Sequence, residues 1–150
     1  MITLQKLEAD LPEVDYNLLK LAVSMTLSKF NQPKADVTIR LTSDEEMKQL
    51  NQTYRRVSSP TDVLSFNQDF MDPETGRIYL GDIVISLEMV AEQAPKYNLT
   101  IDQECAFLAI HGALHLLGFD HNQSEEKDEM WNIQDKIFKE TIKEFQETLQ

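Results

Sequence analysis

All three histidines of this 150-residue chain lie within eleven residues, at His111, His115 and His121. Residues four apart on an α-helix project from the same face, so His111 and His115 can present two imidazoles to one ion. Gly118 can end that helix and let the chain turn back, which brings His121 to the same ion. Three neutral imidazoles suit Zn²⁺ and leave a fourth tetrahedral position for water or substrate. The spacing therefore predicts an open, catalytic type of zinc site, with one ion per chain.

The same spacing occurs in the metzincin proteases, whose pattern is His-Glu-x-x-His-x-x-Gly-x-x-His. Gly112 stands where those proteases carry the glutamate that activates water, so a metallopeptidase is kept only as an alternative. Gly112 makes room either for a bulky substrate or for close helix packing, and the sequence does not decide between them. Asp120 can orient an imidazole, act as a base or cap the turn. Cys105 cannot be assigned to the histidine face from the sequence.

Alternating helical and strand patterns surround the histidines and predict the elements that position them. Predicted helices span Pro12–Phe30, Thr42–Tyr54, Ser86–Tyr97, Ile101–Leu117 and Glu125–Leu149, and predicted strands span Ile2–Leu7, Asp36–Leu41, Thr61–Phe66 and Ile78–Ser86. Asn67–Gly76 is expected to be a turn-rich connection. The helix before Gly118 is apolar on most sides, which predicts that it is buried. This order indicates a single α+β domain over residues 1–150, with a small mixed sheet covered by helices and the metal site at the end of the buried helix.

Composition excludes several other classes of protein. Hydrophobic residues make up 41% and charged residues 27% of the chain, as in an ordinary globular domain, and the single cysteine excludes an intrachain disulfide framework. Fourteen basic residues against 26 acidic ones give a net charge of −12, which disfavours non-specific coating of DNA. The N-terminus has no signal-peptide pattern, and the longest strongly apolar run, Cys105–Ile110, is too short to span a bilayer. We expect a cytoplasmic protein without a membrane or DNA partner.

Charge is unevenly distributed along the chain. The region from Tyr16 to Thr61 holds seven basic and four acidic residues, although the chain as a whole is acidic. We expect this region, with Lys20, Lys29, Lys48 and Arg55, to form the positive wall of a cleft that has the metal on its opposite wall. Such a wall would let an acidic protein bind a polyanion.

Three blocks of sequence resemble the bacterial YbeY family. The most specific is His-Gly-Ala-Leu-His-Leu-Leu-Gly-Phe-Asp-His at residues 111–121, which resembles the family signature His-Gly-x-Leu-His-Leu-x-Gly-aromatic-Asp-His. Leu-Asn-Gln-Thr-Tyr-Arg at 50–55 with Pro-Thr-Asp-Val-Leu-Ser-Phe at 60–66, and Gly-Asp-Ile at 81–83, are similar to two further family blocks in the same order. One departure is Asn67, where many members have proline, and we expect it to affect only a loop.

The resemblance implies a single-domain α+β, zinc-dependent endoribonuclease. In this family the activity is single-strand-specific and serves rRNA processing, at the 3′ end of 16S rRNA, and ribosome quality control. By position, His111, His115 and His121 would be the metal ligands, and Arg55 the functional arginine that completes the catalytic set. RNA would be the substrate, with the ribosomal subunit or ribosomal proteins as partners. The attacking group stays open between a metal-bound water and the 2′-hydroxyl of the RNA. A ribosome-associated binding protein with a structural zinc is the remaining alternative.

Overall fold

Four strands form one mixed sheet, in the order β1-β2-β4-β3. The computed structural model describes residues 1–120 and 124–149. Strands β1 and β2 are parallel, as are β2 and β4, whereas β3 pairs antiparallel with β4 and forms one edge of the sheet. The strands span β1 (Ile2–Lys6), β2 (Asp36–Thr42), β3 (Val63–Met71) and β4 (Ile78–Ser86). The predicted mixed sheet is confirmed.

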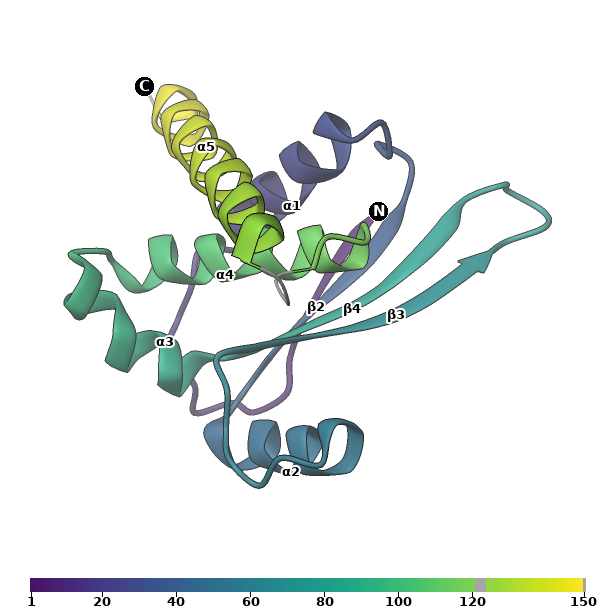
Figure 1. Ribbon diagram of the computed structural model, residues 1–150. Coiled ribbons are helices and arrows are strands. Elements are labelled where there is room, and N and C mark those ends of the chain that lie inside the picture. Colours follow the sequence, from purple (N-terminus) through teal and green to yellow (C-terminus); the bar gives the residue numbers. More distant parts are fainter. Residues whose placement is uncertain (121–123, 150) are drawn as a thin grey trace.

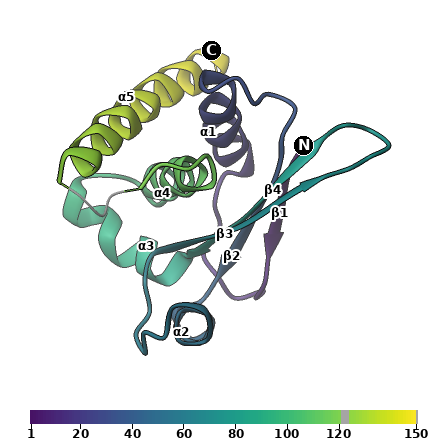
Figure 2. The same ribbon diagram turned by 45° about the vertical axis from the view of Figure 1, so that its right-hand side comes forward.

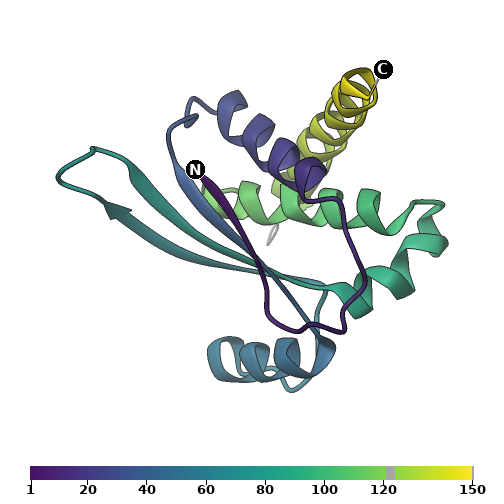
Figure 3. The ribbon, with the colours of Figure 1, turned by 180° about the vertical axis from the view of Figure 1, so that it is seen from behind.

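Helices cover the two faces of this sheet unequally (Figure 1). The helices span α1 (Tyr16–Lys29), α2 (Asp44–Arg55), α3 (Leu87–Gln93), the 3-10 helix η1 (Ala94–Tyr97), α4 (Ile101–Leu116) and α5 (Ser124–Thr148). Helices α1, α4 and α5 form a layer over one face, and α2 alone lies across the other, as the rotated and rear views also show (Figures 2 and 3). The main core lies under the three-helix layer, where Ile39, Ile83 and Ile110 are fully buried.

Helix α4 has strong signals at both ends. Thr100 and Gln103 form a complete capping box at its start, as their spacing predicts. At its other end Gly118 adopts a left-handed φ of 102°, and the amides of Gly118 and Phe119 donate to the carbonyls of His115 and Leu114. These two hydrogen bonds form a Schellman motif, which turns the chain back after the second histidine. The fully buried side chains between these ends confirm the predicted buried helix.

Gly112 is required for close packing of α4 on the sheet. A Cβ atom at this position would lie 2.5 Å from Cγ2 of Ile83 and 3.2 Å from Oγ of Ser65. The Ser65 hydroxyl in turn donates to the Gly112 carbonyl at 3.0 Å, which joins α4 to β3. Of the two roles left open by the sequence, the structure therefore selects helix packing. A glutamate here would be directed against Ile83, which removes the basis for a metzincin-like peptidase.

Several predicted boundaries are wrong for identifiable reasons. Helix α1 begins at Tyr16 rather than Pro12, because the Asp15 carboxylate accepts hydrogen bonds from the amides of Asn17 and Leu18. Helix α3 ends at Gln93 and continues only as a 3-10 turn, because Pro95 has no amide hydrogen to donate.

The first half of the predicted connection Asn67–Gly76 is strand. Strand β3 continues to Met71, and the turn is closed by the Asp72 amide donating to the Arg77 carbonyl at 2.9 Å. The extension projects beyond the helical layer as a two-stranded hairpin (Figure 1). The side chains of residues 67–71 in β3 are all exposed, so the alternation that marks a half-buried strand is absent from this segment.

None of the described helices combines the length and apolar composition needed to cross a bilayer.

Substituting Gly112→Ala should destabilise the fold by forcing α4 away from β4. Overpacking of this kind costs about 1–3 kcal/mol, and the better helix propensity of alanine offsets up to about 1 kcal/mol. Chemical denaturation would measure the difference. The matched test combines Gly112→Ala with Ile83→Ala, which removes both isoleucine atoms near the added methyl group. The double variant should be about as stable as Ile83→Ala alone, and simple additivity of the two losses would refute this packing account.

Candidate active site

A pocket of about 480 Å³ lies where α2, β3 and the C-terminal half of α4 meet. Its lining includes Arg55, Ser65, Asn67, His111 and His115. Both predicted histidines of α4 and the predicted arginine of α2 are therefore brought to one cavity, although 56 residues separate Arg55 from His111 in the sequence.

His111 and His115 direct their imidazoles to the same point. Their Nε2 atoms lie 3.0 Å apart and their ring planes meet at 72°. Two nitrogens that each lie about 2.0–2.1 Å from one tetrahedral zinc ion are separated by about 3.3 Å. The pair thus comes close to a metal-binding arrangement through helical spacing alone.

Gln134 of α5 fixes the orientation of His111. Its amide Nε2 donates to the Phe107 carbonyl at 3.2 Å, so its Oε1 must face His111 Nδ1, 3.0 Å away. In a neutral His111 ring, Nδ1 therefore carries the proton, and Nε2 accepts the hydrogen bond from His115 Nε2. Fixing the tautomer through the second ring nitrogen is the usual way in which proteins prepare a histidine ligand.

Sequence reasoning missed Gln134, although a signal was present. The buried stripe of α5 runs through Met130, Gln134, Ile137 and Thr141, all of which are at most 1% exposed. A glutamine in such a stripe requires buried hydrogen-bond partners, and it finds them on α4. Helix α5 contributes no metal ligand within the described residues, but through Gln134 it orients the imidazole of His111.

His121, the third predicted ligand, lies outside the described residues. Within residues 1–120 and 124–149, no group of three histidine, cysteine, aspartate or glutamate side chains is placed to hold a metal. Asp120 lines the pocket, and its three proposed roles remain predictions. Cys105 is fully buried in the core, where burial raises the pKa of its thiol, so it does not belong to the site.

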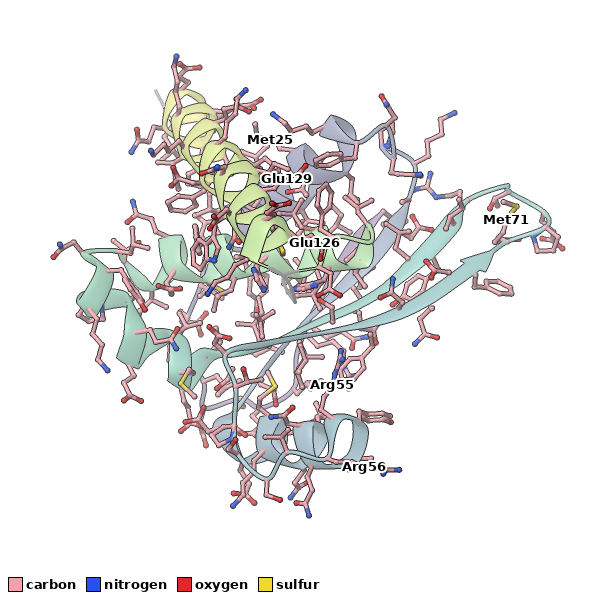
Figure 4. The ribbon with its side chains drawn as sticks, in the orientation of Figure 1. Met25, Arg55, Arg56, Met71, Glu126 and Glu129 are labelled. Atoms are coloured by element: carbon pink, nitrogen blue, oxygen red, sulfur yellow. The ribbon has the colours of Figure 1, made fainter. Side chains whose placement is uncertain are left out.

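Arg55 is the last residue of α2 and extends toward the sheet, as Figure 4 shows. Its Nη2 donates to the Ser65 carbonyl at 3.1 Å, which holds the guanidinium at the pocket while leaving further N–H donors for a ligand. The neighbouring Arg56 has a left-handed φ of 58° as the C-cap, and its side chain points away from the pocket (Figure 4).

The expected positive wall is wrong for its lysines, although Arg55 does line the pocket. Lys20 and Lys29 lie on α1 in the three-helix layer, whereas Lys48 lies on α2 across the opposite face of the sheet (Figure 1). Among the described residues that line the pocket, Arg55 is the only lysine or arginine. These lysines are close together in the sequence, which is why we expected one surface. The chain crosses from α1 through β2 to α2, however, so they lie on opposite sides of the sheet.

Asn67 also has a different place from the one expected. It lies within β3 rather than in a loop, lines the pocket, and donates from Nδ2 to the Leu116 carbonyl at 3.0 Å. Leu116 is the last residue of α4, whose terminal carbonyls have no partner within the helix. Asn67 thus ties the end of the histidine helix to the edge strand, a contact that proline could not make.

Comparison with known proteins identifies relatives whose matches cover nearly the whole chain. Residues 3–142 match the family model described as "Endoribonuclease YbeY". A protein of that name from Brevibacillus brevis is 35% identical over 154 residues, covering 93% of this chain and 97% of the relative. Another, from Carboxydothermus hydrogenoformans, is 43% identical over 131 residues, covering 87% of this chain and 88% of the relative.

A solved structure supports the fold independently. The solution structure of a Thermotoga maritima protein aligns with a TM-score of 0.65 at 30% sequence identity. The alignment covers 99% of this chain and 93% of that protein. The predicted α+β architecture is therefore confirmed by a measured structure as well as by the arrangement of these strands and helices.

Replacing Gln134 with leucine should weaken the preference of the neutral His111 ring for the tautomer that is protonated at Nδ1. Loss of one buried hydrogen bond removes about 1 kcal/mol of preference for the Nδ1–H form, which is about a fivefold change in the tautomer ratio. Nitrogen NMR of the imidazole rings, recorded on metal-free protein above pH 7.5, reports the ratio directly. Thr141→Val on the same helix is the matched control, because the buried Thr141 hydroxyl donates to the Ile137 carbonyl of α5 itself. An unchanged ratio in a folded Gln134→Leu variant would contradict the assigned role.

Proposed function

The chain belongs to the YbeY endoribonuclease family, and we propose that it is a metal-dependent endoribonuclease that cleaves single-stranded RNA during rRNA processing. The observation that carries this proposal is the pairing of two converging imidazoles with one arginine across a single pocket. Imidazoles bind a divalent metal, and a guanidinium binds a phosphate, so the pocket holds the two groups needed at a phosphodiester bond.

The donor set fits zinc. His111 and His115 supply neutral nitrogen ligands from α4, and we assign His121 as the third ligand, giving one ion per chain. A bound zinc ion would polarise a phosphoryl oxygen and lower the pKa of a coordinated water to about 7. Gln134 keeps the Nε2 lone pair of His111 directed at the ligand position. The Schellman motif at Gly118 ends α4, and Asp120, the residue before His121, lines the same pocket as the pair.

Arg55 positions the scissile phosphate. A guanidinium presents its N–H donors in a plane that matches two phosphate oxygens, and charge-assisted hydrogen bonds are the strongest of their kind. The Ser65 carbonyl anchors one edge of the Arg55 group, so less side-chain freedom is lost when the phosphate binds. Arg55 thereby holds the substrate against the histidine wall of the pocket and counters negative charge that develops there.

The two alternatives have less support. A metallopeptidase needs a general base next to the first histidine, and Gly112 at that position faces Ile83 rather than the pocket. A purely structural metal does not account for an exposed arginine held over the pocket that the histidines line. Consistent with a role in rRNA processing, we propose a cytoplasmic location and contact with the ribosomal subunit or its proteins.

The first test is metal content and cleavage of single-stranded RNA by wild-type protein and His115→Ala. We expect about one zinc per wild-type chain, and a loss of cleavage of at least 10²-fold in the variant, as well as after chelation. Because metal binding is coupled to folding, circular dichroism must show that the variant is folded. Cleavage by a folded, metal-free His115→Ala protein would exclude the proposed mechanism. Peptide hydrolysis in place of RNA cleavage would favour the peptidase.

Arg55→Ala should lower kcat/KM for RNA by about 10–100-fold, because a charge-assisted hydrogen bond contributes about 1.5–3 kcal/mol. Arg55→Lys keeps the charge but loses the planar fork, so it should recover only part of the loss. Arg56→Ala is the matched control, since its side chain points away from the pocket (Figure 4). Equal effects of the Arg55→Ala and Arg56→Ala substitutions would show that general charge, rather than a positioned guanidinium, supports the activity.

A further inference from the structure

A second cavity, of about 320 Å³, lies beside the active-site pocket. Its lining includes Asp62, Glu104, Phe107, Trp131 and Asp135. It is formed by the residue before β3, the end of α3 with η1 and the turn after it, the N-terminal half of α4, and α5.

Among the described residues, the two pockets have no lining residue in common, but residues that are close together in the chain line them. Asp62 lines the second pocket and Val63, the next residue, lines the first. Along α4, Phe107 precedes His111 by one helical turn, and Gln134 bonds both of them. A chain bound with one unit against His111 can therefore place a neighbouring unit in the second pocket.

Glu104 gives this second pocket a buried carboxyl oxygen that can still accept a hydrogen bond. The residue is only 3% exposed, and its Oε2 has no hydrogen-bond partner within the described part of the chain. Burial raises the pKa of Glu104, and the nearby Asp62 carboxylate raises it further. A buried carboxyl group without a partner is destabilising unless a ligand supplies hydrogen-bond donors.

Aromatic rings form a large part of the rest of the lining, together with Gln93, Leu99 and Leu108. The Phe107 ring lies 5.8 Å from that of Trp131 and 5.2 Å from that of Phe138, measured between centroids. Trp131 is nevertheless 48% exposed, so one part of its indole is open to a ligand. Flat aromatic surfaces beside a hydrogen-bond acceptor match an unstacked nucleobase, which stacks through its faces and is read along its edge.

Building on the proposed ribonuclease function, we propose that this second pocket is a base-recognition subsite that selects guanine in the RNA substrate. The Watson–Crick edge of guanine offers two adjacent donors, N1–H and N2–H, which one carboxylate can accept with both oxygens. Adenine and cytosine place an acceptor nitrogen beside their amino donor, and uracil places carbonyl oxygens on both sides of its single N–H. Three carboxylates near the pocket also repel phosphate, so the base rather than the backbone enters.

Trp131 is the only tryptophan of the chain and reports directly on the second pocket. Fluorescence excited near 300 nm would be titrated with the four ribonucleosides, which carry no phosphate and require no metal. Guanosine should quench Trp131 saturably and bind about tenfold more tightly than uridine. In Glu104→Gln this preference should disappear, whereas Glu147→Gln, an exposed carboxylate far along α5, should retain it.

Other outcomes of the titration would overturn the proposal. Saturable quenching by N-acetylarginine amide, without quenching by guanosine, would assign the second pocket to a cationic protein side chain. If guanosine and uridine bound equally tightly, both to the wild-type protein and to Glu104→Gln, the second pocket would stack bases without distinguishing between them. No saturable binding of any nucleoside would exclude a base subsite altogether.

A cleavage assay connects the subsite to the reaction. Oligouridine substrates with one guanosine moved along the strand should show a position at which kcat/KM rises about tenfold, and inosine there should lose most of the gain because it lacks the N2 amino group. Glu104→Gln should remove the position dependence while it retains cleavage of oligouridine. A rise that is independent of position, or one that persists in the variant, would contradict the subsite. Failure to cleave any RNA would instead count against the proposed function, and the nucleoside titration would still decide the pocket.

Discussion

The close approach of α4 to the sheet is the constraint on which the site depends. Gly112 brings the helix backbone so near to Ile83 that no side chain fits between them, and the Ser65 hydroxyl donates to the Gly112 carbonyl at the same point. Successive helical residues are rotated by about 100°, so a helix that faces the sheet at Gly112 presents His111 beside it. His115 follows one turn later on the same side. The packing of α4 on the sheet therefore also determines where His111 and His115 point.

The elements around α4 turn that packing into a defined pocket. Asn67 holds the last carbonyl of the helix to β3, and Gln134 reaches from α5 to set the tautomer of His111. From the other face of the sheet, α2 ends at Arg55, which is bonded to the same edge strand through the Ser65 carbonyl. β3 thus connects the histidine wall with the arginine wall, and a displacement of this strand would change the separation of both groups.

Local patterns in the sequence predicted the parts of the site that local chemistry determines. The pairing of His111 and His115, the helix stop at Gly118 and the capping box at Thr100 all follow from spacing along one helix. The role of Gly112 stayed open because its neighbour Ile83 is distant in the sequence. The lysines of α1 and α2 were wrongly grouped for the same reason, since only the crossover of the chain shows that they lie on different sides. Gln134 was visible as a polar residue in a buried stripe, but its partners were not.

The charge of the chain limits how RNA can bind. A net charge of −12 repels a polyanion, but at physiological ionic strength the repulsion is screened beyond about 8 Å. Among the described residues that line the active-site pocket, Arg55 is the only basic side chain, so a long backbone-tracking groove is not formed there. Under the proposed function, affinity comes from short-range contacts: the metal and the Arg55 guanidinium at the reacting phosphate, and neutral stacking contacts in the proposed base subsite. Such a balance favours unpaired RNA, because only an unstacked base can enter an aromatic pocket.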